Sequence, residues 1–470
     1  MSDSSVATMS DSSVFGTAGA TLEQVRGALR QNTFSAVRKV LPDSAILTAC
    51  AVAGYEYRER LIPPLVVVLH MLLAAIWPED SFAASWQLVW ENMVAHLPGA
   101  CGPEPGSGSV AKARNRVPLA VWEAVFAYVV RQAQALGGAV NRWQGHRLVL
   151  LDGACVSMSA EEELFATFGT NTSGAHKGRY PLARLVTLAL ANTKIVLTYA
   201  LGNYRDSEPA LARTLLPGLQ SGDLVIADRF FAAAYLYALY LSHGLQFLTR
   251  MHQRLKPHAL RRLCTNTPDD FVAELPLGAP YRKQYPLLPS VTQVRFIGAF
   301  VPTRAGLEQV WLATSLLSAE DYPAAEIVAL FARRWRIEEL FFDLKINLSA
   351  DVLRSKTAAG IRKEVAARLT ALNVVRLIML EAAVQERVDP LRIGFVHTLR
   401  CILAFSPALA TAPILSLPAL YRTMLRRIGS HLVPARPGRQ EPRMVRRERV
   451  HYPTLKTTRA EWRAANGIAA

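Results

Sequence analysis

The sequence predicts a multidomain α/β protein: a mixed five-stranded sheet with helices, a β-rich insertion and a helical N-terminal domain. Three observations support this fold class. Apolar residues recur at helical spacing from Leu22 to Leu97. Strand-like and helix-like segments alternate from Arg147 to Met251, which is typical of helices packed on a sheet. At 470 residues with 51% apolar side chains, the chain is long enough for roughly two to four domains.

The N-terminal part is predicted to be a tail followed by a helical DNA-binding domain. Residues 1–20 are polar and contain the segment MSDSSV twice, so we expect a disordered tail that buries nothing. Residues 21–98 form the helical domain, because apolar residues recur there at helical spacing and prolines separate the segments. No single recognition helix can be chosen from this pattern.

The most apolar stretch predicts a buried helix and not a membrane span. Residues 61–77 include Pro63, Pro64 and His70, and they fall short of the about 20 apolar residues that cross a bilayer. The N-terminus has neither the basic region nor the apolar run of a signal peptide. We therefore expect a cytoplasmic protein that has no membrane partner.

Residues 99–146 are predicted to connect the two main regions. Residues 99–109 are rich in Gly, Pro and Ser and are interpreted as a linker. Residues 110–146 are interpreted as two connecting helices. Three cations of the first helix are candidates either for contact with a DNA backbone or for an ordinary solvated helix face; they are Lys112, Arg114 and Arg116.

Residues 147–251 are predicted to form the first part of the sheet core. RLVLLDGACVSM is the first strand, and a hairpin around residues 192–194 joins the second and third strands. Ser207 is a candidate N-cap for a helix that runs to about Leu219. GDLVIADRFF then predicts a fourth strand, a helix begins near Ala232, and LQFLTRM predicts the fifth strand.

The remaining chain is predicted to insert strands and then to complete the core with helices. Residues 252–320 form the β-rich insertion. Residues 321–385 hold one continuous helix from about Ala324 to Leu348 and another from about Ala358 to Ala383. Residues 386–470 form a C-terminal helical region with a basic tail.

The charge predicts a polyanionic partner. The chain has 53 Lys and Arg against 37 Asp and Glu, a net charge of +16. Residues 421–470 hold twelve Lys or Arg and three Glu, a net of +9, so the charge is concentrated at the C-terminus. Double-stranded DNA is the favoured partner and a membrane surface is the second. A solubilising tail is the alternative interpretation of the C-terminal charge.

Other site chemistries are disfavoured. No HExxH, GxSxG or GxxxxGK[ST] motif is present, so a metalloprotease, an esterase and a P-loop ATPase are not supported. Five scattered cysteines without CxxC spacing argue against a disulfide framework and a zinc site.

Two aspartates follow apolar strand segments in the predicted core. Asp152 comes after LVLL and Asp228 after LVIA, and a carboxylate at a strand exit suits a metal ligand. For either one alone, a structural turn is the more common reason for Asp. The conjunction with a third acid is what favours chemistry.

The third acid, Glu338, shares a helical stripe with Phe331, Arg334 and Lys345 at about 100° per residue. A surface ion pair of Arg334 and Glu338 is the plain alternative. Three carboxylates beside cations predict two Mg²⁺ or Mn²⁺ ions held against a phosphate. Trp335 is predicted to pack in the core or along its helix in preference to stacking on a base.

The segments YPAAEIVALFARRWRIEELFFDLK, GDLVIADRFF and LLDGACVSM resemble the DDE transposases of the insertion sequence four family. The resemblance spans roughly residues 22–460 and implies an RNase H-like core. It implies the catalytic and metal-binding triad Asp152, Asp228 and Glu338. The family's Tyr-Arg-Glu-Lys signature falls on Phe331, Arg334, Glu338 and Lys345, with phenylalanine in place of tyrosine. The residues assigned to DNA contact are Phe331, Arg334, Lys345, Arg229 and Lys356.

The implied activity is cut-and-paste transposition with Mg²⁺ or Mn²⁺, by a homodimer that pairs two DNA ends at the nucleoid. Two alternatives stay open at this point. One is an RNase H-like nuclease that cuts without joining. The other is an inactive DNA-binding repressor derived from a transposase, which Phe331 favours slightly and the complete set of acids disfavours.

Overall fold

The computed structural model describes residues 35–434, except 59, 61, 78–80, 97–103, 172–177, 253–254 and 304–305, and it also describes residue 465. Residues 1–433 belong to one compact unit. The predicted tail at 1–20 and most of the basic C-terminal tail lie outside the described residues. Within the described ranges, no helix combines the length and the apolar character that crossing a membrane requires.

The N-terminal region is helical, as predicted. It contains α2 (Ser35–Val40), α3 (Asp43–Val52), α4 (Pro64–Ile76) and α5 (Phe82–His96). Pro42 and Pro63 stand at the N-caps of α3 and α4, where a missing N–H costs nothing. Every residue of α4 is buried, so the prediction of a buried helix there is confirmed.

Two helices lead into the sheet. They are α6 (Ser107–Arg116) and α7 (Leu119–Gly137). The helix α6 begins at Ser107, inside the stretch interpreted as a linker, because the first N–H groups of a helix need no intrahelical partner and so tolerate Ser and Gly.

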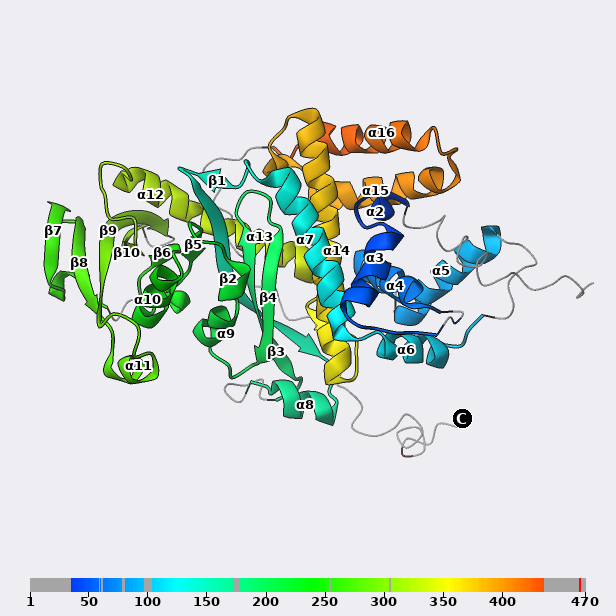
Figure 1. The fold of residues 1–470 in the computed structure, drawn as a ribbon, viewed down its shortest axis with the longest axis horizontal. Helices are drawn as coiled ribbons and strands as arrows, with labels where there is room; N and C mark the ends of the chain where they lie inside the picture. The colour runs from blue at the N-terminus through cyan, green and yellow to red at the C-terminus, as the bar shows by residue number, and fades with distance from the viewer. Residues whose placement is uncertain are drawn as a thin grey trace, which may run out of the picture. The chain divides into compact units, whose positions relative to one another are not determined.

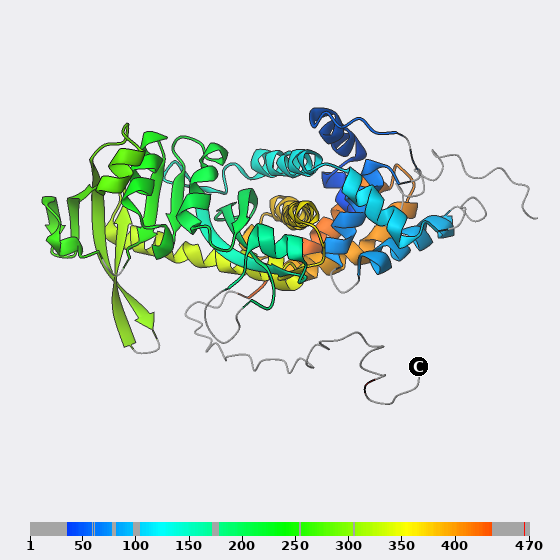
Figure 2. The ribbon, with the colours of Figure 1, turned by 90° about the horizontal axis from the view of Figure 1, so that it is seen from below.

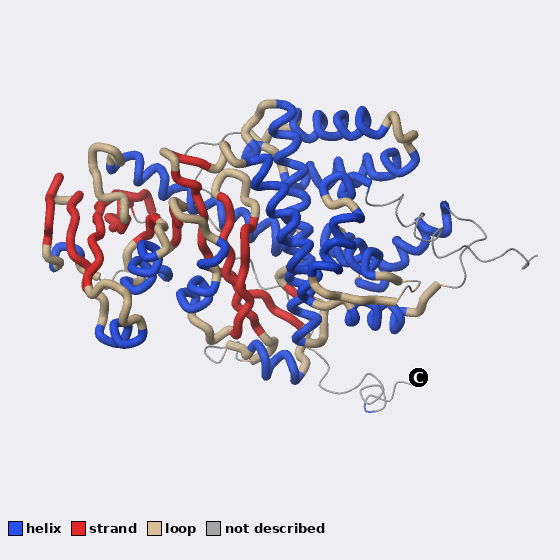
Figure 3. Tube along the Cα trace, in the orientation of Figure 1, coloured by secondary structure: helices blue, strands red, loops and turns tan. Residues whose placement is uncertain are grey.

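The core sheet is mixed, which confirms the predicted fold class (Figures 1 and 3). The five core strands are β2 (His146–Met158), β3 (Leu182–Leu190), β4 (Val196–Asn203), β5 (Leu224–Ala227) and β6 (Gln246–Arg250). β2 pairs antiparallel with β3 and parallel with β5, and the spatial order of the five is β4-β3-β2-β5-β6.

Among the described residues the sheet has eleven strands and not five, because the predicted insertion adds four strands and two short strands pair with β2. The strands of the insertion are β7 (Arg262–Thr267), β8 (Asp270–Pro276), β9 (Val291–Thr303) and β10 (Gly306–Thr314). Two short strands lie outside it: β1 (Arg142–Trp143), which precedes β2, and β11 (Val352–Leu353), which follows the insertion in the chain. β10 pairs antiparallel with β6, and β1 and β11 both pair with β2. The pairing of β10 satisfies the N–H and C=O groups that β6 would otherwise leave at an edge.

Helices cover the sheet on both sides (Figure 2). α9 (Glu208–Thr214) contacts β3 and β4, and its N-cap Ser207 accepts a hydrogen bond from Ala210, as predicted. It ends before the predicted Leu219, since Pro217 cannot continue the hydrogen-bond ladder. The remaining elements are α8 (Glu162–Phe168), η1 (Leu216–Gly218), η2 (Arg229–Phe231), α10 (Ala234–Ser242), η3 (Pro257–Ala259) and α11 (Ala279–Gln284).

The helix expected to be continuous from Ala324 to Leu348 is interrupted twice. α12 (Ala324–Phe331) is followed by a 3₁₀ turn, η4 (Ala332–Arg334), and then by α13 (Trp335–Phe342). A π-helical turn, η5 (Asp343–Asn347), ends the segment. Propensity alone does not predict this turn, because it rests on a buried contact between Asp343 and Arg376 of a later helix.

The last helices form the centre of the helical region. α14 (Ala358–Glu386) has 29 residues and packs against α4 and α7. It is followed by η6 (Pro390–Arg392), α15 (Phe395–Thr411) and α16 (Leu417–Ser430). α14 therefore joins the N-terminal helices to the sheet core within one unit.

Candidate active site

Two predicted carboxylates are neighbours where the parallel pairing of β2 and β5 ends. The last paired residues are Leu151 and Ala227, so Asp152 and Asp228 come next on adjacent strands. Adjacent strands lie about 4.7–4.9 Å apart, and the charge of Asp228 raises the pKa of Asp152. The fold therefore places the first two acids next to each other at the end of this pairing.

Asp152 does not stand at the exit of its own strand, contrary to the prediction. β2 continues to Met158, because the residues beyond Asp152 still pair with β3. The strand that ends here is its neighbour β5, after Ala227. The opening beside Asp152 is thus made by a short neighbouring strand.

Arg334 connects Asp152 to Glu338. Its Nη1 lies 3.9 Å from Asp152 Oδ2, and its Nη2 lies 3.4 Å from Glu338 Oε1. The Arg334 side chain is only 10% exposed, so these contacts are less screened than those of a solvated pair. The predicted ion pair of Arg334 and Glu338 on the helix is present, and Arg334 also contacts Asp152 in the sheet. The first and third acids therefore face one guanidinium.

The environment raises the pKa of Asp152 to about 6. Burial is the main cause, because it removes water from the charged form. The Gly153 N–H donates to Oδ1 at 2.8 Å and lowers the pKa, as does Arg334. Glu208 and Asp228 raise it further. A half-buried acid with acidic neighbours is a position that a bound cation stabilises.

Glu208 supplies a fourth carboxylate that sequence patterns do not reveal. It is the first residue of α9 and accepts a hydrogen bond from Arg184 at 2.8 Å. Its Oε1 lies so close to Gly153 that a Cβ there would stand 2.6 Å away. The only signal in the sequence is an acid in the first turn after an N-cap, which ordinary helix capping also explains.

Phe331 and Lys345 make separate contacts. Phe331 is half-buried at the end of α12, and its ring centre is 6.0 Å from Arg334 Cζ. Lys345 lies in the π-helical turn, with Nζ 3.5 Å from Asp351 Oδ1. A π turn has a wider repeat than an α-helix. The stripe predicted for one regular helix is therefore interrupted before Lys345.

The other two assigned cations lie in different places. Arg229 follows Asp228 in η2, with its Cζ 5.4 Å from the ring centre of Phe230. Lys356 precedes α14, and its Nζ is 3.5 Å from Glu161 Oε1. Arg229 therefore adjoins the acids, whereas Lys356 lines a pocket bounded by α4, α6 and α14.

Trp335 is 57% exposed, so of the two predicted places, the core and the helix surface, the core is excluded. Its ring centre lies 4.9 Å from Arg334 Cζ, a cation–π contact. The ring therefore helps to hold the guanidinium that faces the acids.

The donor chemistry of the cluster suits Mg²⁺ or Mn²⁺, since its charged oxygens are the ligands that these ions prefer. Across the part of the chain that the structure describes, no three His, Cys, Asp or Glu side chains are close enough to hold an ion. Two buried atoms, Thr187 Oγ1 and Arg334 Nε, have no hydrogen-bond partner in the protein. Thr187 stands opposite Asp152 in the sheet. The cluster thus has polar capacity left for a further group.

Residues 143–374 match the family model described as the transposase DDE domain. The chain is also 25% identical over 365 residues to Transposase InsG for insertion sequence element IS4 of Escherichia coli (strain K12). That alignment covers 76% of this chain and 80% of the relative. The chain belongs to the DDE transposases.

Two further proteins are similar to this transposase. Putative transposase InsZ of Escherichia coli (strain K12) is 31% identical over 124 residues, which are 26% of this chain and 42% of the relative. A cryo-EM structure of the piggyBac transposase synaptic complex with hairpin DNA has a TM-score of 0.42 and 11% identity, and covers 87% of both chains.

The predicted enzyme class is therefore confirmed. The protein is a DNA transposase, an enzyme of DNA cleavage and strand transfer, and its family uses divalent metal ions and binds DNA.

Proposed function

We propose that Asp152, Asp228 and Glu338 are the catalytic residues of cut-and-paste transposition. The observation that carries this proposal is the contact of Arg334 with both Asp152 and Glu338, beside the neighbouring Asp228. A guanidinium held among acids marks a point where positive charge is needed. In a DNA transposase, that point suits a phosphate together with its cations.

The same three carboxylates are the proposed ligands of two Mg²⁺ or Mn²⁺ ions, and to hold them they would have to draw closer together than they are in the described structure. When bound, such ions supply Lewis-acid activation of an attacking oxygen and stabilise the charge on the leaving oxygen. Asp152 has to be ionised for this role, although its pKa is raised to about 6. Arg334 would then turn from the acids to the phosphate, where its planar fork can donate two hydrogen bonds.

The residues proposed to contact DNA near the cleaved bond are Arg334, Lys345, Arg229 and Phe331. The cations would hold phosphate oxygens. Phe331 has no hydroxyl, so its contribution is an apolar contact with the stem of Arg334. Lys356 is proposed to hold DNA at a different place, the pocket at the start of α14.

The proposed reaction begins when water hydrolyses the phosphodiester at the end of the element. The 3′-OH released in that step attacks the opposite strand and later the target DNA, and each attack expels a DNA oxygen as the leaving group. We further propose that the transposase works as a homodimer at the nucleoid, because two ends must be held together and the chain carries a charge of +16.

Replacing Asp228 with Asn, or Glu338 with Gln, is expected to lower end cleavage more than about 100-fold, because loss of even an outer-shell partner of a metal costs about 10–100-fold. End binding should stay within about threefold, since neither acid pairs with DNA. Cleavage of a labelled element end in Mg²⁺, with binding measured in EDTA, checks both. Normal cleavage by either variant would remove that residue from the site.

A matched control is Glu274→Gln. Glu274 lies on β8 and pairs with the exposed Arg261, so this change removes one surface acid without touching the cluster. Cleavage should remain within about twofold of the unchanged protein. A precleaved end tests joining separately: absence of joined product in Mg²⁺ would favour a nuclease without strand transfer.

A further inference from the structure

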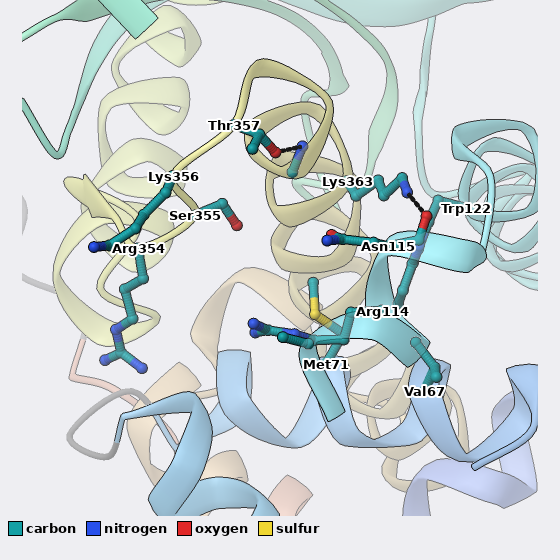
Figure 4. Close-up of a pocket in the computed structure, with 12 residues that line it drawn as sticks. Val67, Met71, Arg114, Asn115, Trp122, Arg354, Ser355, Lys356, Thr357 and Lys363 are labelled. Carbon is teal, nitrogen blue, oxygen red and sulfur yellow. Dashed lines mark hydrogen bonds between the residues drawn. The ribbon is translucent and has the colours of Figure 1, made fainter. Parts of the chain in front are cut away.

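A pocket of about 300 Å³ lies beside the start of α14, apart from the carboxylate cluster (Figure 4). α4 and α6 supply one side of it, and the segment before α14 and its first turns supply the other. These elements belong to one compact unit. Segments about 240 residues apart in the sequence therefore build one concave site.

The lining of this pocket is strongly basic. It contains four cations, Arg114, Arg354, Lys356 and Lys363, and none of the residues described along it is acidic. Like charges brought together in a partly desolvated space repel one another. An arrangement of this kind persists at low cost only when an anion occupies it.

The protein compensates these charges incompletely: Lys356 pairs with Glu161 at 3.5 Å, but among the described residues two other cations have no acidic partner at such a distance. Lys363 Nζ donates to the backbone carbonyl of Asn115 at 2.8 Å, a neutral partner. Arg114 Cζ lies 3.9 Å over the ring centre of Phe82, and its Nη1 is buried without a hydrogen-bond partner. Burial also lowers the pKa of both Arg114 and Lys363. These two cations therefore have donors and charge left for a ligand.

The nearest buried acid is already used by the protein. Glu364 accepts hydrogen bonds from the backbone N–H groups of Arg354 and Ser355, at 2.9–3.1 Å. It also pairs with Arg368 at 3.0 Å. Its carboxylate thereby shapes the segment before α14, and its charge also acts on Arg114, where it opposes the effect of burial on the pKa.

The start of α14 adds to the positive potential. Thr357 caps this 29-residue helix and accepts from Gly360 N–H at 3.1 Å, and both residues line the pocket. The N-terminal end of a long helix carries a partial positive charge and favours phosphate groups. Glu163 already accepts from the N–H of Ala358 at 2.8 Å, so the helix end is partly neutralised and the side-chain cations carry most of the argument for an anion.

A second basic hollow lies along the same helix α6. It has a volume of about 270 Å³ and includes Arg58, Arg60 and Arg116, with Glu56 as its one described acid. Arg114 lines the first pocket and Arg116 the second, so α6 separates two anion-attracting hollows. Repeated sites of this kind fit a polymer of phosphates better than one small anion.

We propose that the pocket lined by Arg114, Arg354, Lys356 and Lys363 holds a backbone phosphate of the DNA bound by the transposase. The contact would be independent of base sequence and would fix the position of DNA along α6. This inference rests on the proposed function only in its ligand, DNA, and not in the identity of the catalytic acids. A small phosphorylated molecule is the other source of the same chemistry.

The test is the salt dependence of DNA binding by the full chain with Lys356→Gln and Lys363→Gln combined. Glutamine keeps a donor for the Asn115 carbonyl. The pocket is proposed to hold one phosphate, so losing that contact should make the slope of log K against log[salt] shallower by about 0.9. At 0.1 M salt, the affinity should fall on the order of 10-fold.

The matched control removes two exposed cations outside both hollows, Lys39 on α2 and Arg131 on α7, as Lys39→Gln with Arg131→Gln. Its salt slope should equal that of the unchanged protein. Equal slopes for the pocket variant and the unchanged protein would overturn the proposal. The single variant Lys356→Glu separates loss of the contact from loss of folding. The Lys356 side chain is 77% exposed, so this variant should stay folded and should still bind DNA with a shallower salt slope.

A titration of inorganic phosphate into DNA-free protein separates the two ligand sources. Saturable millimolar or tighter binding that the pocket variant loses, with an unchanged DNA slope, would assign the pocket to a small phosphorylated molecule and overturn the DNA assignment. All binding is measured in EDTA, where the acids play no part. Failure of the Asp228→Asn test would therefore contradict the catalytic assignment and leave this one standing.

Discussion

Asp152→Asn is expected to make the metal-free transposase more stable while abolishing its cleavage. The folded protein raises the pKa of Asp152 from 3.8 to about 6, so ionising this group in the folded state costs free energy. One pKa unit corresponds to about 1.4 kcal/mol, which gives a cost of about 3 kcal/mol at neutral pH. Asparagine does not ionise, and its oxygen can still accept from Gly153 N–H. The variant avoids this cost.

The pH dependence of the free energy of unfolding should show that ionised Asp152 destabilises the folded protein. Between about pH 4 and pH 6, folded Asp152 binds a proton that the unfolded chain has released, so the free energy of unfolding of the unchanged protein falls as the pH rises. Above about pH 6 the loss is complete. The advantage of Asp152→Asn should therefore be absent below about pH 4 and largest above pH 6. Urea denaturation in EDTA at several pH values measures this difference.

Added Mg²⁺ should make the unchanged protein more stable than Asp152→Asn, the reverse of the order in EDTA. A cation that binds the folded protein stabilises it in proportion to its concentration over the dissociation constant. The unchanged protein should gain stability with Mg²⁺, and Asp152→Asn should gain much less. At limiting Mg²⁺, cleavage should also decline as the pH falls, because protonation of Asp152 competes with the cation. Equal stability of the two proteins at pH 8 in EDTA would contradict the buried, charged state inferred for this acid.

The sequence predicts the parts of this site that follow from local patterns, such as strand ends and helical spacing. Asp152 and Asp228 follow apolar strand segments, so their convergence is predictable from strand pairing. Glu338 and Arg334 are an i,i+4 pair, which helix geometry predicts. Glu208 is not predictable, because an acid after an N-cap is common, and only the contact with Gly153 reveals its place.

Contacts between distant segments are what the sequence predicts least well. The sheet extends beyond its five core strands because β10 pairs with β6, and no local pattern specifies that partner. The basic pocket joins α6 to α14, whose cations look like separate solvated groups in the sequence.

The π-helical turn after α13 is the strongest case of such long-range control, and it leads to the second large effect. Asp343 forms a buried salt bridge with Arg376 of α14 and accepts from Asn347 at 2.8 Å. The Arg376 side chain is 4% exposed. Asp343→Ala would leave its guanidinium as an unpaired buried charge. The expected loss of stability is about 3–5 kcal/mol.

The combined variant Asp343→Leu with Arg376→Met separates stability from positioning. Removing both charges of a buried pair is often nearly neutral, so most of the lost stability should return. The turn would also lose its anchor and can relax towards α-helix. One residue of helix is about 100° of rotation, so Lys345 would leave its place beside Asp351. We expect cleavage to stay at least about tenfold below that of the unchanged protein, with the larger part of the change in the KM for DNA.

A second buried pair provides the control, because it lies in the continued sheet and not beside Lys345. Arg295 on β9 donates to Asp270 on β8 at 2.6–2.7 Å, and the Arg295 side chain is fully buried. Asp270→Ala should cost a similar free energy of unfolding but leave the KM of the remaining folded protein unchanged. The activity depends on the shape of the π-helical turn only if that turn positions Lys345. Full cleavage by the Asp343→Leu, Arg376→Met double variant would therefore show that the turn stabilises the helix but does not position Lys345.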